Sequence, residues 1–355
     1  MKRVVLAIDS FKGCLSSVEA EAAAEAGVQE HWRDTEVVRI PVTDGGDGML
    51  GVFSQLLDCK KITVGCHDAL MRPIRAAYGV SADCTVILET ASACGISLLR
   101  KQELNPLHTT TYGVGELFAD AFRRGFRRFV VGLGGSATCD CGLGMLAALK
   151  DAFGAGWHDR LPQNLDITLA SDVDNPLFGE QGAAAVFAPQ KGASPQMVAS
   201  LERRARTFAR MAAAHLGHDR SGDRGAGAAG GLGYAFLQFM DAKAKSGADI
   251  LLETAGFDKI VDGADLIVTG EGSADEQTLM GKISGRVLEY GIRKCVPVML
   301  IAGRVSGAEA LLHAGFTYVK CITPLGMPLE EAMRPAVAKE NIRKALAEED
   351  LPYLK

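Results

Sequence analysis

The chain has 355 residues, 48% of them hydrophobic and 23% charged, with a formal net charge of −5 and a sequence pI of about 5.9. The length favours two domains over one, and the acidic balance argues against nucleic acid or an anionic membrane as a partner. The nine cysteines include no Cys-x-x-Cys pair, which excludes zinc-binding and thioredoxin-like patterns. The sequence shows no signal peptide and no bilayer-spanning stretch, and we expect a cytoplasmic protein.

Short apolar runs that end in polar or glycine-rich turns predict strands throughout the chain. The expected strands cover residues 4–8, 37–42, 86–88, 129–133, 167–170, 266–268, 298–301 and 318–322. Helical segments separate many of these strands. This alternation predicts an α/β fold with mostly parallel sheets.

Local signals mark the ends of three expected helices. Ser16 and Glu19 form a capping box for a helix over 16–30. The Ser194-Pro195 pair begins a second helix, which ends near residue 216. Residues 329–349 are expected to form a third helix, kinked at the proline at position 335.

The strands at the two ends of the chain form a set of five. Five parallel strands with helical crossovers predict a flavodoxin-like doubly wound sheet. We therefore expect a discontinuous domain of residues 1–48 and 256–355, interrupted by an inserted second α/β domain of residues 49–255. Ligands are expected in the cleft between the two domains.

The segment 129–144 carries the most informative motif. Its apolar start predicts a buried strand, its middle contains Gly134, Gly135, Ser136 and Thr138, and a helix-forming run follows. Such a strand, glycine loop and helix start direct backbone N–H groups at an anion. The alternative is a tight turn that binds nothing.

Acidic and basic residues follow several of the other predicted strands. Carboxylates in glycine turns suit Mg²⁺ or a substrate hydroxyl, and lysines beside glycine suit anions. The same residues also make ordinary solvated turns. The candidates are Asp44 and Asp47 in segment 43–48, Asp172 in segment 171–176, Glu271, Asp275 and Lys282 in segment 270–282, and the lysines Lys12 and Lys191.

The sequence also contains a glycine pattern typical of dinucleotide binding, but the residues before it rule this interpretation out. Segment 225–230 fits G-x-G-x-x-G, but the polar residues before it cannot form the strand that this fingerprint requires. No Walker P-loop is present. Glycine loops, basic residues and several acids together are the groups that phosphoryl transfer needs.

The motifs also resemble a known family, the bacterial type I glycerate kinases. Two carry much of the resemblance, Pro41-Val-Thr-Asp-Gly-Gly-Asp-Gly48 and Gly132-Leu-Gly-Gly-Ser-Ala-Thr138. Further matching segments are 8–12, 105–116, 172–176, 188–193, 225–233 and 270–272. They occur in the family's order over nearly the whole chain.

The resemblance implies ATP-dependent phosphorylation of D-glycerate to 2-phosphoglycerate with Mg²⁺. The sequence departs from the family pattern at two places. Ser273 stands where the family commonly has Arg, and segment 139–142 usually reads Asn-Asp-Gly-Gly in the family. The segment between residues 147 and 170 also looks shorter than usual. Arg304, Arg286 or Lys282 are candidates to replace the missing guanidinium.

We expect the following roles. The loop residues Gly134, Gly135, Ser136 and Thr138 hold nucleotide or substrate phosphate, Lys12 and Lys191 neutralise anionic oxygens, and Glu271, Asp275 and Lys282 contact the nucleotide. The acids Asp44, Asp47 and Asp172 are candidates for the catalytic base, and Asp47 and Asp172 also for Mg²⁺ binding. The alternatives are a kinase of another small hydroxy acid and a non-catalytic sensor of a small acid, motivated by Ser273. No macromolecular partner is expected, and a homo-oligomer stays possible.

Overall fold

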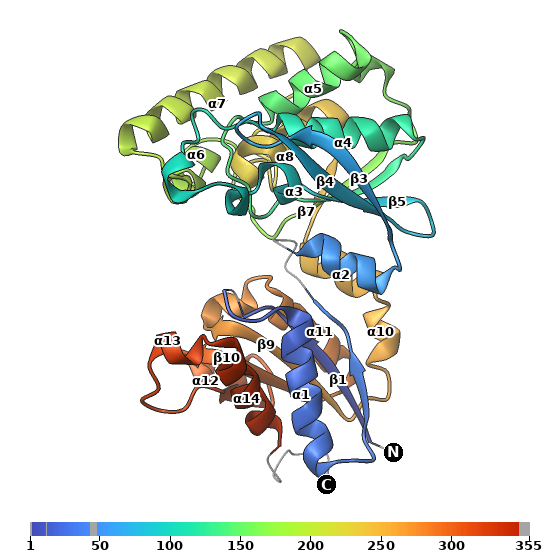
Figure 1. Ribbon diagram of the computed structural model, residues 1–355, viewed down its shortest axis with the longest axis vertical. Coiled ribbons are helices and arrows are strands. Elements are labelled where there is room, and N and C mark those ends of the chain that lie inside the picture. Colours follow the sequence, from blue (N-terminus) through green and yellow to red (C-terminus); the bar gives the residue numbers. More distant parts are fainter. Residues whose placement is uncertain (1, 12, 43–47, 348–355) are drawn as a thin grey trace. The chain divides into compact units, whose positions relative to one another are not determined.

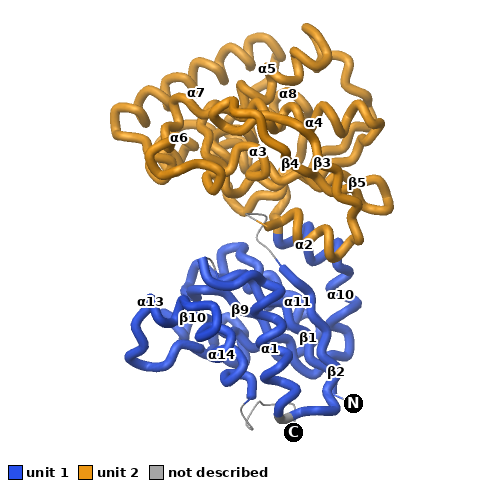
Figure 2. Tube along the Cα trace, viewed as in Figure 1, with its two compact units in different colours: residues 1–44, 248–355 blue, residues 45–247 orange. Residues whose placement is uncertain are grey.

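The computed structural model describes residues 2–11, 13–42 and 48–347. The predicted site residues Lys12, Asp44 and Asp47 lie outside these ranges. The chain divides into two compact units, residues 1–44 with 248–355 (unit 1) and residues 45–247 (unit 2) (Figures 1 and 2). Among the described residues, no helix combines the length and the apolar character that crossing a bilayer requires.

Unit 1 contains a five-stranded parallel sheet in the order β11-β10-β9-β1-β2. Its strands are β1 (Arg3–Ile8), β2 (Glu36–Arg39), β9 (Leu266–Ala274), β10 (Val298–Val305) and β11 (Tyr318–Cys321). Counted within the unit, this order is 2-1-3-4-5, which is the flavodoxin-like order. The doubly wound sheet predicted from the chain ends is therefore confirmed.

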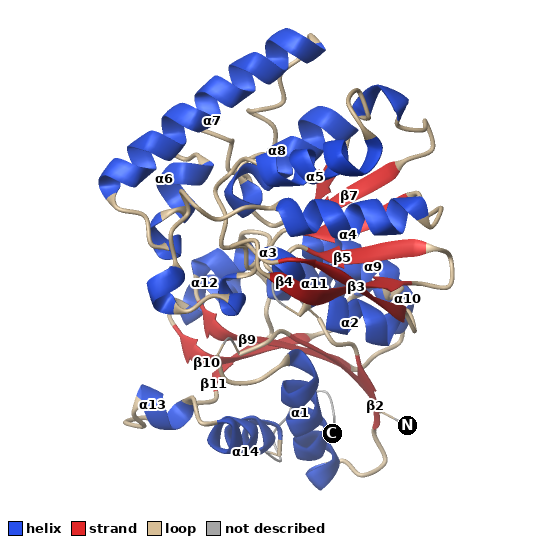
Figure 3. Cartoon of the chain, turned by 45° about the horizontal axis from the view of Figure 1, so that its top comes forward, coloured by secondary structure: helices blue, strands red, loops and turns tan. Residues whose placement is uncertain are grey.

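Helices cover both faces of the sheet in unit 1 (Figure 3). They are α1 (Ser17–His31), α9 (Gly247–Thr254, at the unit boundary), α10 (Phe257–Ile260), α11 (Ile283–Lys294), α12 (Ala308–His313), α13 (Leu329–Ala332) and α14 (Pro335–Leu346). Alternate residues of β1, including Leu6, pack with Ala24 of α1 and Ile342 of α14 in one buried cluster. Helix α11 contacts β1, β9 and β10. The two-sided cover explains why the central strands β1, β9 and β10 contain buried apolar runs, whereas the edge strands β2 and β11 have exposed ends.

Unit 2 contains a six-stranded mixed sheet in the order β3-β4-β5-β6-β7-β8. Its strands are β3 (Lys60–His67), β4 (Pro73–Val80), β5 (Thr85–Glu89), β6 (Arg128–Gly132), β7 (Asp166–Ala170) and β8 (Lys243–Lys245). Strands β5 to β8 are parallel, whereas β3-β4 and β4-β5 are antiparallel pairs. The sequence predicted β5, β6 and β7 but not the other three strands.

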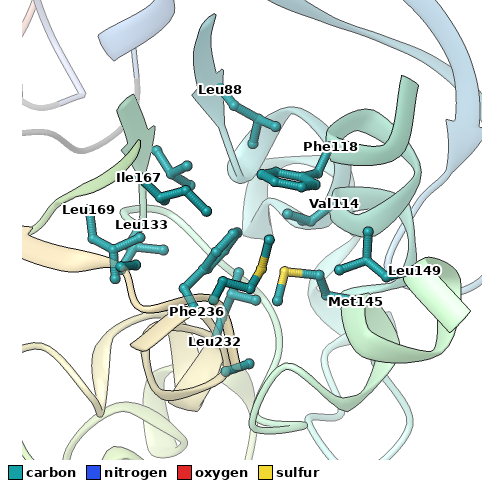
Figure 4. Close-up of a cluster of buried hydrophobic side chains, with 14 of the residues drawn as sticks. Leu88, Val114, Phe118, Leu133, Met145, Leu149, Ile167, Leu169, Leu232 and Phe236 are labelled. Carbon is teal, nitrogen blue, oxygen red and sulfur yellow. The ribbon is translucent and has the colours of Figure 1, made fainter. Parts of the chain in front are cut away.

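The helices of unit 2 enclose its core against the sheet. They are α2 (Met49–Leu56), α3 (Ala91–Cys94), α4 (Tyr112–Arg123), α5 (Leu143–Phe153), α6 (Ala183–Phe187), α7 (Pro195–Leu216) and α8 (Ala228–Met240). Figure 4 shows Phe118 of α4, Met145 of α5 and Phe236 of α8 meeting Leu133 and Ile167 from the sheet side. Burial of these large apolar side chains supplies the main driving force for this unit.

The predicted helix signals are confirmed at two positions and corrected at a third. Ser16 caps α1, with the Glu19 amide donating to its Oγ at 3.3 Å, and Ser194 caps α7. The expected C-terminal helix is two helices, α13 and α14, because Pro335 starts a new helix instead of kinking one.

Candidate active site

The loop after β6 has the geometry of an anion-binding site. The backbone N–H groups of Gly134, Gly135 and Ser136 donate to no acceptor within the described part of the chain. Gly135 has φ +71°, in the left-handed region that turns successive N–H groups toward one side. Three consecutive unused donors at the carboxyl end of a parallel strand favour a phosphate or carboxylate ligand.

Neighbouring segments hold this loop in place. The Ile96 amide donates to the Gly135 carbonyl, and the Ala137 amide donates to the Cys94 carbonyl, each at 2.8 Å. These bonds form an isolated bridge between Gly95 and Ser136. The loop is therefore shaped before any ligand binds, which lowers the entropy cost of binding.

Lys191 lies beneath the loop. It is 3% exposed, and its Nζ donates to Ser136 Oγ at 2.9 Å and to the Thr138 carbonyl at 2.7 Å. Burial lowers the pKa of Lys191, since the charged form loses hydration. The structure thus brings three predicted residues together, with the lysine supporting the loop from inside.

Asp140 was part of the predicted motif but was not chosen as a site residue. Its carboxylate accepts four hydrogen bonds, from the Thr111 amide and hydroxyl and from the Gly142 and Gly144 amides, at 2.8–3.1 Å. These bonds tie the start of α4 to the start of α5. A carboxylate inside a glycine loop was the available sequence signal, because exposed amides at a helix start attract an acid.

The ends of β5 and β7 lie on either side of the loop. The sheet register pairs Glu89 with Gly132, and Gly132 with Ala170, so the segments after these strands meet at one edge. Asp172 follows β7, and its Oδ1 accepts the Gly247 amide at 3.1 Å. At the end of β5, Glu89 accepts the Gly48 amide at 2.6 Å. Glu89 was not among the site residues predicted from the sequence.

Carboxylates such as Asp172 are the oxygen ligands that Mg²⁺ prefers. Within residues 2–11, 13–42 and 48–347, no group of three or more His, Cys, Asp or Glu side chains is arranged to hold a metal ion. A Mg²⁺ ion bound by one or two carboxylates and substrate phosphates fits this donor set.

The glycine-rich segment 225–233 has a packing role. Gly230 has φ +68°, and a Cβ there would collide with the Thr138 carbonyl. The Cys141 amide donates to the Gly230 carbonyl at 3.1 Å, and the Gly227 amide donates to the Asn175 carbonyl at 2.8 Å. These contacts bring the segment against the loops after β6 and β7, which explains its glycines without a dinucleotide.

Unit 1 has a cavity of about 380 Å³ at the carboxyl ends of β1, β9, β10 and β11. Glu271 and Lys282 line it, and the Lys282 Nζ contacts the Glu271 Oε2 at 2.9 Å. Glu271 is 7% exposed, and its Oε1 has no hydrogen-bond partner among the described residues. Glu271 belongs to β9, which continues six residues beyond the strand end predicted at residue 268.

Of the three candidates for the missing guanidinium, two line this cavity. Arg304 of β10 lies directly opposite Ser273 of β9 in the sheet register, and both line the cavity together with Lys282. Arg304 is exposed and makes no ion pair with a described residue. Arg286 does not line the cavity and pairs with Asp249 at 3.2 Å and with Glu289.

Asp275 is used as a helix cap. Its Oδ1 accepts the Gln277 amide at 2.8 Å at the start of the 3₁₀ helix Glu276–Leu279. It does not line the cavity. The structure therefore joins Glu271 and Lys282 in one cavity and leaves Asp275 outside it.

A doubly wound sheet with charged groups at its strand ends and a loop of unused amides define an α/β enzyme for small anionic molecules. The chain matches the Glycerate kinase family over residues 4–156 and 154–349. It is 38% identical to a glycerate kinase of Bacillus subtilis strain 168 over 94% of each chain. It is 33% identical to a glycerate 2-kinase of Escherichia coli K12 over 97% of this chain and 98% of that one. The chain therefore belongs to the glycerate kinase family.

The solved structures give the same result. A crystal structure from Salmonella typhimurium LT2, provisionally assigned as glycerate kinase 2, is similar with a TM-score of 0.81 and 33% identity. The match covers 98% of this chain and 96% of that chain.

Proposed function

We propose that the protein transfers the terminal phosphoryl group of ATP to D-glycerate and forms 2-phosphoglycerate. The observation that carries the proposal is the loop 134–136, whose three unused amides suit a phosphate. Family membership over nearly the whole chain supports the same reaction. The bond between the terminal phosphorus and ADP breaks, and a bond to the glycerate 2-oxygen forms.

In this proposal the loop amides and Ser136 bind phosphate oxygens, and Lys191 keeps the loop in shape from beneath. A carboxylate accepts the proton of the glycerate hydroxyl, and Asp172, Asp44 and Asp47 are the candidates. The same acids, Asp172 and Asp47 first, would hold Mg²⁺, which neutralises charge on the phosphates. Lys12 adds a positive charge, and Lys282 and Glu271 contact the nucleotide. Asp275 acts through the turn that it caps.

An assay coupled to ADP release tests the reaction across D-glycerate, L-glycerate and other small hydroxy acids. We expect D-glycerate to give the highest kcat/KM, and ³¹P NMR to find the phosphate on the 2-oxygen. A different best acceptor would support the kinase of another hydroxy acid. Tight glycerate binding without any ADP release would favour the sensor and overturn the proposal.

Asp172→Asn tests the acid at the end of β7. Loss of a general base or a metal ligand should lower kcat by roughly 10²–10⁴-fold. The matched control is Asp174→Asn, because Asp174 is exposed and pairs with Arg224. If Asp172→Asn is as active as Asp174→Asn and the unmodified protein, Asp172 is not part of the site.

We also propose that the two compact units are the two domains expected from the sequence. The cytoplasmic location and the homo-oligomeric state stay predictions, which cell fractionation and light scattering would test.

A further inference from the structure

The cavity of unit 1 lies at the position where flavodoxin-like sheets bind ligands. In the order 2-1-3-4-5 this position is the crevice between the first and third strands of the sheet. Those strands are β1 and β9, and Asp9 to Phe11 after β1 and Glu271 to Ser273 of β9 line the cavity. Its volume of about 380 Å³ lies within the range of roughly 300–1,000 Å³ typical of small-molecule sites.

One wall of the cavity is apolar. Phe11, Ile322, Leu329, Met333 and Ala338 contribute to it. Leu329 and Met333 are exposed side chains of the α13 segment, at 71% and 40%. A three-carbon hydroxy acid has no apolar face to place here, whereas covering this wall with a planar base would bury apolar surface on both partners.

Glu271 supplies an unused acceptor inside the cavity. Its Oε2 contacts Lys282, and its Oε1 has no partner among the described residues although Glu271 is only 7% exposed. Buried polar atoms in folded proteins are nearly always hydrogen-bonded, so this oxygen requires a donor from a ligand or water. A ribose hydroxyl is such a donor, and carboxylates fill this role in dinucleotide sites.

Two cationic side chains of the described residues, Lys282 and Arg304, border the same cavity. Lys282 already balances Glu271, whereas Arg304 forms no ion pair with the residues that the structure describes. A guanidinium without a counter-charge suits a phosphate group, which it can bind with two parallel hydrogen bonds. The cavity thus offers an apolar wall, an acceptor and a cation in one space.

We propose that this cavity binds the nucleoside diphosphate part of the phosphoryl donor. The base packs on the apolar wall, Glu271 Oε1 accepts a ribose hydroxyl, and Arg304 binds a phosphate. The inference rests on the proposed kinase function. It adds Arg304 and the apolar wall to the site, and it assigns the nucleoside to unit 1.

Calorimetric titration of the full chain with ADP tests the assignment without any acceptor present. We expect Glu271→Gln and Arg304→Ala each to raise the Kd of ADP by about tenfold or more. The matched controls are Glu276→Gln, an exposed acid outside the cavity, and Arg293→Ala, whose guanidinium lies over the Tyr290 ring. Far-UV circular dichroism and Tm of each variant report whether it is folded.

Titration with 2′-deoxy-ADP and 3′-deoxy-ADP isolates the contact with ribose. The unmodified protein should bind one of them about tenfold more weakly than ADP, and Glu271→Gln should abolish that difference. An equal loss for all three ligands in Glu271→Gln would overturn the ribose contact. Unchanged ADP binding in folded Glu271→Gln and Arg304→Ala would overturn the whole assignment.

The two proposals fail separately. If ADP binds as expected but no hydroxy acid stimulates ADP release, the kinase proposal fails and the cavity assignment stands. If D-glycerate is phosphorylated and Glu271→Gln raises only the KM of glycerate, the cavity is the acceptor site and the assignment is overturned.

Discussion

Two buried carboxylates, one in each unit, differ in how many of their hydrogen bonds the protein supplies. Asp140 of unit 2 is 9% exposed and accepts four hydrogen bonds from the protein. Glu271 of unit 1 is 7% exposed and pairs with Lys282, and its Oε1 has no partner among the described residues. Asp140, whose carboxylate oxygens are fully hydrogen-bonded, fixes the shape of a loop. Glu271 faces a cavity, and its Oε1 can still accept a hydrogen bond from a ligand.

A third buried carboxylate, Glu21 of α1, shows what happens without a cavity or a cation in contact. It is fully buried, its Oε1 accepts the Ile8 amide at 3.4 Å, and its Oε2 has no partner among the described residues. Burial raises the pKa of Glu21 to about 9, so the side chain carries a proton at neutral pH. The hydrogen-bond and charge partners of a buried acid therefore decide its role. Asp140 has donors for both oxygens and is structural, Glu271 keeps one oxygen for a ligand, and Glu21 is uncharged.

The largest effect is expected for Asp140→Ala. Removing the carboxylate leaves three backbone amides and the Thr111 hydroxyl without their acceptor, at about 1–3 kcal/mol for each buried group. We expect the free energy of unfolding of unit 2 to fall by about 3 kcal/mol or more, measured by urea denaturation. The control is Asp151→Ala, an exposed acid that accepts only the Tyr112 hydroxyl among the described residues. A similar small loss in both variants would contradict the structural role of Asp140.

Lys191→Met is expected to rank second. The substitution keeps much of the buried chain length but removes the donor to Ser136 Oγ and the Thr138 carbonyl. We expect about 2 kcal/mol lower stability and kcat/KM on the order of 100-fold lower, because the loop amides lose their arrangement. Lys150→Met, at an exposed position of α5, is the control. Full activity in Lys191→Met would show that the loop holds its shape without the cation.

Glu21→Gln should change how stability depends on pH. The folded-state pKa of about 9 lies above the ordinary value of 4.5, so the folded state binds the extra proton between these limits. This contribution to stability is complete below about pH 4.5 and is lost as pH rises through 9, by at most ~1.4 kcal/mol per pH unit. We expect Glu21→Gln to remove that loss, with the gain growing from pH 5 to pH 9 in urea titrations. Glu36→Gln, on the exposed edge strand β2, should track the unmodified protein. If the free energy of unfolding depends on pH in the same way in all three proteins, Glu21 is not protonated in the folded state at neutral pH.

The smallest effect is expected beside Asp140. Cys141 has φ +55°, in the left-handed region that glycine adopts without strain. Cys141→Gly relieves this strain and loses a buried thiol, while Cys141→Ala loses the thiol and keeps the strain. We expect the alanine variant to be less stable than the glycine variant by about 1 kcal/mol. The reverse order in urea denaturation would show that the backbone at this position is not strained.

The sequence predicted the five strands of unit 1 because each contains a short apolar run followed by a polar or glycine-rich turn. It did not predict β3 and β4, which form an antiparallel hairpin with polar residues on its exposed side, such as Lys61 and Thr63 of β3. Strand β8, at Lys243–Lys245, is too short and too polar to give a signal and is set by pairing with β7. Pairing between distant segments decided these elements.

Much of the candidate site was predictable from glycines and acids at strand ends. The support of Ser136 by Lys191 was not, because burial of a lysine depends on tertiary packing. The alignment of Arg304 with Ser273 was not predictable either, since it requires the register of β9 and β10. The predicted Asp275 proved to be a cap, a role that acids at helix starts share with ligand-binding acids.

The pairing of β1 with β9 also sets the order in which the chain can fold during translation. Ala7 of β1 and Thr269 of β9 are 262 residues apart. At ~5–20 residues per second, the ribosome therefore needs on the order of tens of seconds to deliver the neighbour of β1 after β1 has emerged. Throughout that interval the inserted unit is synthesised whole, while one edge of β1 waits unpaired and open to aggregation. The insertion therefore makes the cavity of unit 1, which needs both β1 and β9, one of the last parts of the nascent chain to be completed.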